Sequence, residues 1–335
     1  MIGVRARAGI VVCLVCAIAG VSRVNAQTVT AEADLTAGRS TENVNAVATQ
    51  LRLFGSVGRE WRMWAEVTWA GNYKNRESDA FGDAYPYDRR VRPMEIYLER
   101  ALPRAGRIAA LRVGRYREPF GLSARSDHAY AGFSRAPLIR YGRNWALSNS
   151  FMTTGIDALV GYPALSVEAS AGVSQDEGET RRPDALDVTV RAQGYWKSAI
   201  VGVSHMRSKP SMRGSYVHGP MVFTGIDARW MRGGLQLRGE WLDGQPFNGV
   251  TTRGGYIDVL VHQHGMGPVT LVGRMEKLDY DAGPFSAYYH RFVAGGRYQA
   301  TRAIGLQINV LHQPVGLTDG HRTVVDAGVT CTLRF

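Results

Sequence analysis

The sequence predicts an all-β protein, a transmembrane antiparallel β-barrel of sixteen strands, and three observations lead to this prediction. Apolar and polar residues alternate with a period of two over many short segments. Each segment has about ten residues, which is the length at which a tilted strand crosses a bilayer. Tight and long connections alternate between the segments, as they do in barrels that have turns at one end and loops at the other.

The N-terminal residues predict export from the cytoplasm. Basic residues precede an apolar run from Ile10 to Val21, and a small-residue pattern ends at Ala26. This run is too short to span a bilayer as a helix, so we expect residues 1–26 to be a signal peptide that is cleaved after Ala26. The mature chain is then expected to be a single β-barrel domain over residues 27–335, in the outer membrane of a Gram-negative-type bacterium.

Cysteine usage does not indicate a disulfide-stabilised domain. Cys13 and Cys16 lie within the predicted signal, and each follows a valine, where a lipid-attachment signal needs a small residue. Only Cys331 remains in the mature chain, so no intrachain disulfide can form there. We therefore expect stability to come from a large core or from a closed ladder of strands.

The basic charge is carried almost entirely by arginine. The chain has 40 Lys+Arg and 29 Asp+Glu residues, for a net charge of +11, and its lysines are only Lys74, Lys197, Lys209 and Lys277. Arginine presents a planar fork of donors that suits phosphate and carboxylate groups. Export, together with the lack of a basic helix or an RNA-binding motif, argues against a nucleic-acid partner. We expect anionic solutes and lipopolysaccharide as partners, and no cofactor.

The predicted strands have one apolar and one polar face. In the last of them, Val325, Val329 and Leu333 share one parity, whereas Asp326 and Arg334 share the other. Because successive side chains of a strand point to opposite sides, the two sets face different surroundings. The sixteen predicted strands are residues 28–37, 47–57, 60–70, 91–101, 107–116, 154–163, 165–174, 186–197, 199–208, 221–232, 235–243, 252–264, 268–279, 287–299, 304–313 and 322–335.

The connections and the apolar parity indicate a membrane barrel in preference to a soluble sandwich. Counted from the N-terminus, the even-numbered connections are tight and the odd-numbered ones are longer. In lipid every backbone polar group must be paired, so the sheet must close, and its polar face then lines an aqueous channel. Aromatic residues near strand ends on the apolar parity fit interfacial belts. They are Trp61, Trp69, Tyr162, Trp196, Trp230, Trp241 and Tyr298.

The third connection, residues 117–153, is far longer than an ordinary loop, which indicates a functional role. We expect it to fold into the lumen, where an arginine-rich patch would favour anions. The predicted constriction residues are Arg117, Arg125, Asp127, Arg135, Arg140 and Arg143. The predicted wall residues are Arg62, Arg112, Arg191, Arg229, Arg238 and Arg274. Acidic residues of the same parity are expected to pair with many of the wall arginines.

The segment Leu111–Leu122, LRVGRYREPFGL, resembles the Gly-x-aromatic-basic-x-Pro-Phe motif of the phosphate-selective porin O and P family, and Gly142–Tyr162 resembles that family's return into the next strand. The resemblance implies a trimeric, sixteen-stranded outer-membrane porin whose third loop constricts the channel. The matching positions of the loop motif are Gly114, Pro119, Phe120 and Gly121, with Arg115 and Arg117 where the family carries basic residues.

The resemblance also implies that the terminal Phe335 is the signal read by the barrel-assembly machinery. The family's phosphate-specific members are rich in lysine along the lumen, whereas this chain has four lysines in all. The difference favours a broader anion preference that includes phosphate-like solutes.

The sequence therefore predicts passive diffusion of small, hydrophilic, preferentially anionic solutes, and no enzymatic activity. An outer-membrane enzyme of the phospholipase kind is one alternative, and its nearest candidate pair is Ser204 and His205, which neighbouring strand positions place on opposite faces. A structural or adhesive barrel with a plugged lumen is another. His262 and His264, with Asp258, could share a metal, but two histidines on a wet wall are more often polar lining.

Overall fold

A computed structural model describes residues 27–72, 91–104, 106–122, 131–140, 152–175, 179–181, 186–208, 211–213, 216–217, 221–247, 249–262, 267–283, 286–315 and 320–335. The predicted signal peptide lies outside these residues. Within the described ranges, no helix is long and apolar enough to cross a membrane.

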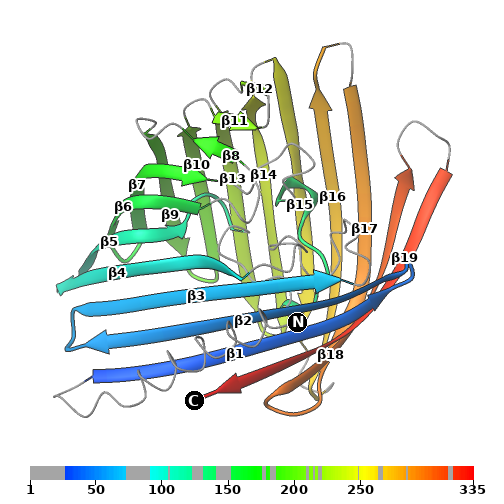
Figure 1. Ribbon diagram of the computed structural model, residues 1–335, viewed down its shortest axis with the longest axis horizontal. Helices are drawn as coiled ribbons and strands as arrows, with labels where there is room; N and C mark the ends of the chain where they lie inside the picture. Colours follow the sequence, from blue (N-terminus) through cyan, green and yellow to red (C-terminus); the bar gives the residue numbers. More distant parts are fainter. Residues whose placement is uncertain are drawn as a thin grey trace, which may run out of the picture.

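Sixteen strands form one closed antiparallel barrel (Figure 1). They are β1 (Gln27–Ser40), β2 (Val44–Val57), β3 (Trp61–Asn72), β4 (Arg92–Arg104), β5 (Arg107–Arg117), β6 (Met152–Gly161), β7 (Leu165–Gln175), β9 (Asp187–Trp196), β10 (Ala199–Ser208), β13 (Met221–Arg232), β14 (Leu235–Phe247), β15 (Val250–Val261), β16 (Val269–Asp281), β17 (Ser286–Gln299), β18 (Ile304–Val315) and β19 (Gly320–Arg334). A separate small sheet contains β8 (Glu179–Arg181), β11 (Ser211–Arg213) and β12 (Tyr216–Val217). The closed sixteen-stranded barrel that the sequence predicts is confirmed.

The barrel closes between its first and last strands. β1 and β19 pair from Glu32 opposite Arg334 to Ser40 opposite Asp326. Beyond the strand, the Phe335 N–H donates to the Ala31 carbonyl at 2.8 Å, and the Ala31 N–H donates to the Phe335 carbonyl at 3.2 Å. The ladder therefore continues to the last residue, and the edge that an open sheet would expose is paired.

The connections are less regular than the sequence predicts. β14 continues to Phe247 and β15 begins at Val250, so the predicted loop 244–251 shrinks to residues 248 and 249. The first connection likewise contains only residues 41–43, whereas the even-numbered connection between β15 and β16 takes 262–268. The strict alternation of tight and long connections is therefore wrong, because several strands continue past their apolar stretch with polar residues on both faces.

In the barrel wall, apolar side chains face outward and charged side chains face inward, which is the reverse of the arrangement in a soluble protein. On β16, Leu271 and Met275 face outward and are about half exposed, whereas Arg274 and Glu276 face inward and are buried. The same division recurs along the barrel strands, where valine, leucine and isoleucine dominate the exposed set and charged residues dominate the buried polar set. A wall of this kind fits a hydrocarbon surrounding and a polar interior.

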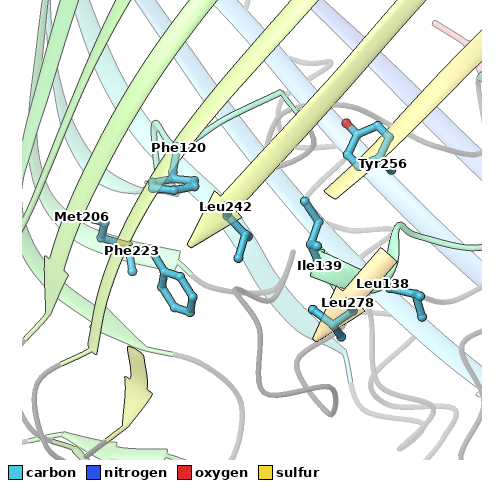
Figure 2. Packing of buried hydrophobic residues seen from close by; sticks show 8 residues of the cluster. All are labelled: Phe120, Leu138, Ile139, Met206, Phe223, Leu242, Tyr256 and Leu278. Carbon is cyan, nitrogen blue, oxygen red and sulfur yellow. The ribbon is translucent and has the colours of Figure 1, made fainter. Parts of the chain in front are cut away.

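The apolar residues that do lie inside the barrel pack against the third connection. Figure 2 shows one such cluster, in which residues from that connection meet inward side chains of several strands. Its members are Phe120, Leu138, Ile139, Met206, Phe223, Leu242, Tyr256 and Leu278. Phe133 joins a second cluster with Leu260, Val272, Val293, Leu311 and Val324. The expected folding of the third connection into the lumen is confirmed for its described residues.

Candidate functional site: the lumen and its inner segment

The described residues of the third connection, 118–122 and 131–140, are called here the inner segment. It leaves β5 after Arg117, and its first part approaches β10, where the Gly121 N–H donates to Ser204 Oγ at 3.1 Å. Its second part ends in the short 3-10 helix η2 (Leu138–Arg140), where Arg140 donates to the Phe120 carbonyl at 2.9 Å. One hydrogen bond thus joins the two parts.

The two motif glycines occupy positions that other residues would strain. Gly114 has a φ of 137°, and a Cβ atom there would lie 2.7 Å from the Tyr97 Cα. Gly121 has a φ of 62°, and a Cβ atom there would overlap the Glu240 carboxylate. Glycine adopts such conformations without steric cost, so Gly121 allows the chain to turn tightly against the wall after Phe120.

Polar side chains of the wall bind the backbone of the inner segment. The Asn309 amide donates to the Gly132 carbonyl at 3.0 Å and accepts from the Ser134 N–H at 2.7 Å. Glu276 accepts from the Leu138 N–H at 2.6 Å, and Arg291 donates to the Ala136 carbonyl. These contacts satisfy backbone groups that would otherwise be buried without partners.

The two described arginines of the inner segment make buried ion pairs with the wall. Arg135 binds Asp326 through two hydrogen bonds of 2.7 and 3.0 Å and also binds Glu42 at 2.8 Å. Arg140 pairs with Glu240. Both arginine side chains are buried, so the structure gives them an anchoring role alongside the predicted one in the constriction.

The other predicted constriction residues have different outcomes. Arg117 is described at the end of β5, where it pairs with Glu66 at 2.8 Å. Arg125, Asp127 and Arg143 lie outside the described residues. The role of the six predicted residues in constricting the channel stays a prediction.

Arg274 is the most enclosed of the predicted wall arginines. Its Nε and Nη2 atoms donate to Asp258 at 2.6 and 3.0 Å, and its Nη1 atom donates to the Arg135 carbonyl at 2.9 Å. Its guanidinium carbon lies 3.9 Å from the ring centroid of Phe133 and 5.2 Å from that of Tyr256. Arg274 therefore joins β15, β16 and the inner segment through charge, hydrogen bonds and cation–π contact.

The remaining wall arginines divide by accessibility. Arg191 and Arg238 are buried and pair with Asp227 at 2.7 Å and Asp258 at 2.8 Å. Arg112 pairs with Asp157 at 2.9 Å and is partly accessible. Arg62 and Arg229 are exposed on the lumen parity toward the ends of their strands. The expected cross-strand pairing with acids is seen for most of the set.

In several lumen pairs the carboxylate is more deeply covered than the arginine, whereas Glu32 and Glu95 are slightly more exposed than their arginine partners. The side chains of Glu66 and Asp157 are 3% and 2% exposed, whereas their partners Arg117 and Arg112 are 13% and 17% exposed. Arg62 is 52% exposed beside a Glu99 that is 13% exposed. Because arginine is longer than either acid, its guanidinium lies over the carboxylate and faces the water of the lumen.

Four inward wall residues contact the inner segment, and the sequence did not predict this contact. Asn309, Asp326, Glu276 and Arg291 all contact the inner segment. Their inward parity is readable from the alternation, but their contact with a loop far away in the chain is not. On another part of the wall, Arg52 of the same inward parity binds Glu32 and Asp34 at 2.7 and 2.8 Å.

The structure also places the residues that were considered for an enzyme and for a metal site. Ser204 is buried against Gly121, whereas His205 points outward and shares a hydrogen bond of 2.9 Å with Thr224. Asp258 is bound to two arginines, and His264 lies outside the described residues. Within the part of the chain that the structure describes, no group of three or more His, Cys, Asp or Glu side chains could hold a metal ion.

Solved porin structures share this fold. The anion-selective porin from Comamonas acidovorans aligns over 92% of this chain and 99% of its own, with 10% identity and a TM-score of 0.62. OmpF of Salmonella typhi, in complex with daunomycin, aligns over 92% of this chain and 97% of its own, with 9% identity and a TM-score of 0.63. The trimer form of Vibrio cholerae OmpT covers 93% of this chain and all of its own length, with 9% identity and a TM-score of 0.57.

At these identities the likeness concerns the fold alone. No protein-family model and no curated protein matches the chain. The resemblance to the phosphate-selective porin O and P family therefore stays a prediction, and the architecture that the chain shares is that of the sixteen-stranded porins.

Proposed function

We propose that the protein is an outer-membrane porin that forms a water-filled channel for the passive diffusion of small hydrophilic solutes, with a preference for anions. The closed barrel supports this function through its apolar exterior and charged interior. The inner segment lies against the interior wall, where it narrows the lumen without breaking the barrel. One porin with the same fold is described as anion-selective.

The anion preference rests on the accessibility of charge, since both signs occur on the wall. Several carboxylates of the lumen parity are fully buried, among them Asp227, Asp258 and Asp326. Arg62 and Arg334, by contrast, are 52% and 74% exposed. A solute that passes Arg62 and Arg334 therefore meets exposed guanidinium groups, and such groups favour anions.

Channel formation is tested by reconstituting the mature chain into planar bilayers and liposomes. We expect stepwise conductance in the bilayers, and liposome swelling in small neutral sugars that falls off with sugar size. Inserted protein that gives neither conductance nor swelling would contradict the proposal and would favour the plugged structural barrel.

The enzyme alternative is tested separately on purified barrel with phospholipid as substrate. Because Ser204 and His205 lie on opposite faces, we expect no turnover from this pair. Turnover that is abolished by Ser204→Ala but kept by Ser170→Ala, another inward serine, would favour the enzyme.

Four further features belong to the proposal. We propose cleavage of the signal after Ala26, recognition of Phe335 by the barrel-assembly machinery, a homotrimer, and contact with lipopolysaccharide. Phe335 is exposed on the outer side, which leaves its ring accessible to a partner during assembly. The mass of the mature chain tests the cleavage site. Native mass spectrometry tests the trimer and the retained lipopolysaccharide. The yield of the Phe335→Ala variant in the outer membrane tests the assembly signal.

A further inference from the structure

The outer surface at the short-turn end of the barrel carries a ring of basic side chains. This end contains the connections between β2 and β3, β4 and β5, β6 and β7, β9 and β10, β13 and β14, β15 and β16, and β17 and β18. Their sequences contain Glu60 as the only acid. We call the exposed basic residues in and beside these connections the basic rim: Arg59, Arg100, Arg107, Lys197, Arg232 and Arg302.

The basic rim surrounds the barrel. Arg59 lies between β2 and β3, Arg107 begins β5, Lys197 lies between β9 and β10, Arg232 ends β13, and Arg302 lies between β17 and β18. Following the strand order of the closed sheet, these positions are spread over its whole circumference. A single docked protein would contact one side of the barrel, whereas lipid headgroups contact every part of the circumference that the proposed homotrimer leaves open.

The rim charges are largely uncompensated. Arg100 donates to Glu60 at 3.3 Å, and its guanidinium carbon lies 5.4 Å from the centroid of the outward Trp61 ring. The other five members form no ion pair among the residues that the structure describes. The rim therefore presents net positive charge to its surroundings.

The outer surface at the opposite end differs in this respect. Its exposed basic side chains include Arg253 and Lys277, which pair with Asp243 at 2.5 Å and Asp279 at 2.7 Å. Acids on the same outer face thus offset these two bases, whereas Arg39 and Arg207 form no ion pair among the described residues. Among the described residues, the outer surface therefore carries more net positive charge at the short-turn end than at the opposite end.

Aromatic side chains place the basic rim at the level of lipid headgroups. Exposed outward rings occur at the same end of the barrel, and they are Trp61, Tyr162, Trp196, Tyr298 and Phe335. Such rings prefer the interface between hydrocarbon and water. The neighbouring arginine and lysine side chains then reach phosphate groups, for which their donors are suited.

We infer that the basic rim binds the anionic headgroups of phospholipids, of which phosphatidylglycerol is the representative, in the leaflet around the short-turn end. The inference rests on the membrane insertion that the proposed function requires. Near an anionic membrane surface each basic residue raises binding about fivefold, and salt weakens the effect. The rim would thereby select the lipids around one mouth of the barrel and hold the barrel at a fixed depth.

The test measures which lipid contacts the barrel. The full mature chain is reconstituted in bilayers that contain brominated phosphatidylglycerol or brominated phosphatidylcholine, and quenching of tryptophan fluorescence gives the relative binding constant of the two lipids. At low salt we expect a preference of about fivefold for phosphatidylglycerol, and near 1 M salt, where the Debye length is about 3 Å, a ratio close to one.

Two matched variants assign the preference to the rim. The first variant combines Arg59→Gln, Arg107→Gln, Arg232→Gln and Arg302→Gln, and it should remove most of the preference because only Arg100 and Lys197 of the rim remain. The control variant removes the same charge from exposed outward positions at the opposite end through Arg39→Gln, Arg207→Gln, Arg253→Gln and Lys277→Gln. It should keep most of the preference for phosphatidylglycerol. All eight side chains are exposed, so both variants should fold, which circular dichroism checks.

The outcomes separate the inference from the proposed function. Equal quenching by both lipids at low salt would overturn the role of the rim while leaving a conducting channel intact. A control variant that loses as much preference as the rim variant would overturn it as well. Absence of quenching by either lipid would show that the barrel is not in the bilayer, and that result would contradict both proposals.

Discussion

Two walls of the lumen use the same residue types in different surroundings. On β14 to β19, arginines and carboxylates are buried under the inner segment, as in the pairs Arg274–Asp258 and Arg291–Glu276. On β2 to β5, similar pairs border the lumen and remain partly accessible, as with Arg112. The first wall anchors the inner segment, and in the proposed function the second wall presents charge to the solute. Inward parity alone does not distinguish these roles, because burial by the inner segment creates the difference.

The largest effect is expected from Arg274→Met, which breaks a fully buried pair. It leaves the Arg135 carbonyl without its donor and Asp258 with one arginine partner fewer. Removing one partner of a buried ion pair typically costs about 3 to 5 kcal/mol. We expect the free energy of unfolding in detergent to fall by about that amount, and single-channel conductance to rise because the inner segment is held less firmly.

The matched control is Arg62→Met on the accessible wall. Arg62 is half exposed and lies 3.3 Å from Glu99, so its loss should change the free energy of unfolding by no more than about 1 kcal/mol. Equal destabilisation by the two substitutions would contradict the distinction between an anchoring and a lining wall.

A smaller loss of stability is expected from Gly121→Ala. The residue has a φ of 62°, and its new methyl group would overlap the Glu240 carboxylate that binds Arg140. Gly58→Ala is the control, because Gly58 has a φ of 61° but nothing within 4 Å of an added Cβ atom. Chemical denaturation should show a cost of about 1 kcal/mol for Gly58→Ala and a larger one for Gly121→Ala. Similar costs would mean that the inner segment adapts freely at this turn.

The smallest effect on stability, and a measurable one on selectivity, is expected from Arg62→Gln combined with Arg334→Gln. Both side chains are exposed on the lumen parity. A unit charge near the path of an ion contributes about 1 kcal/mol at 4 Å in water before screening. We expect the ratio of anion to cation permeability to fall by about twofold at about 0.1 M salt. An unchanged ratio with unchanged conductance would show that these arginines do not face the conduction path.

The barrel could be predicted from the sequence because its signal is local. Along each strand, alternation follows from the different surroundings of the two faces, so the residues of one strand suffice to identify it. The prediction failed at residues 244–251, where β14 continues through Gly244, Gln245 and Pro246 to Phe247. There the alternation that marks a strand is lost.

The candidate site could be predicted only in part. The length and arginine content of the third connection indicated its importance, and Gly121 occupies the turn that its motif predicts. The partners of its arginines could not be predicted, because Arg135 meets Asp326 across 191 positions of the chain. The roles of Asn309 and Glu276 likewise depend on where the inner segment crosses the wall, which no local pattern encodes.

The measurement that tests the central claim most directly is the reversal potential of the reconstituted channel in a gradient of potassium chloride. The covered carboxylates and accessible arginines of the lumen predict a potential of the sign that chloride permeation produces, and this potential should decrease as total salt rises. A potential of the opposite sign, or one of zero at low salt, would contradict the account of charge accessibility in the lumen.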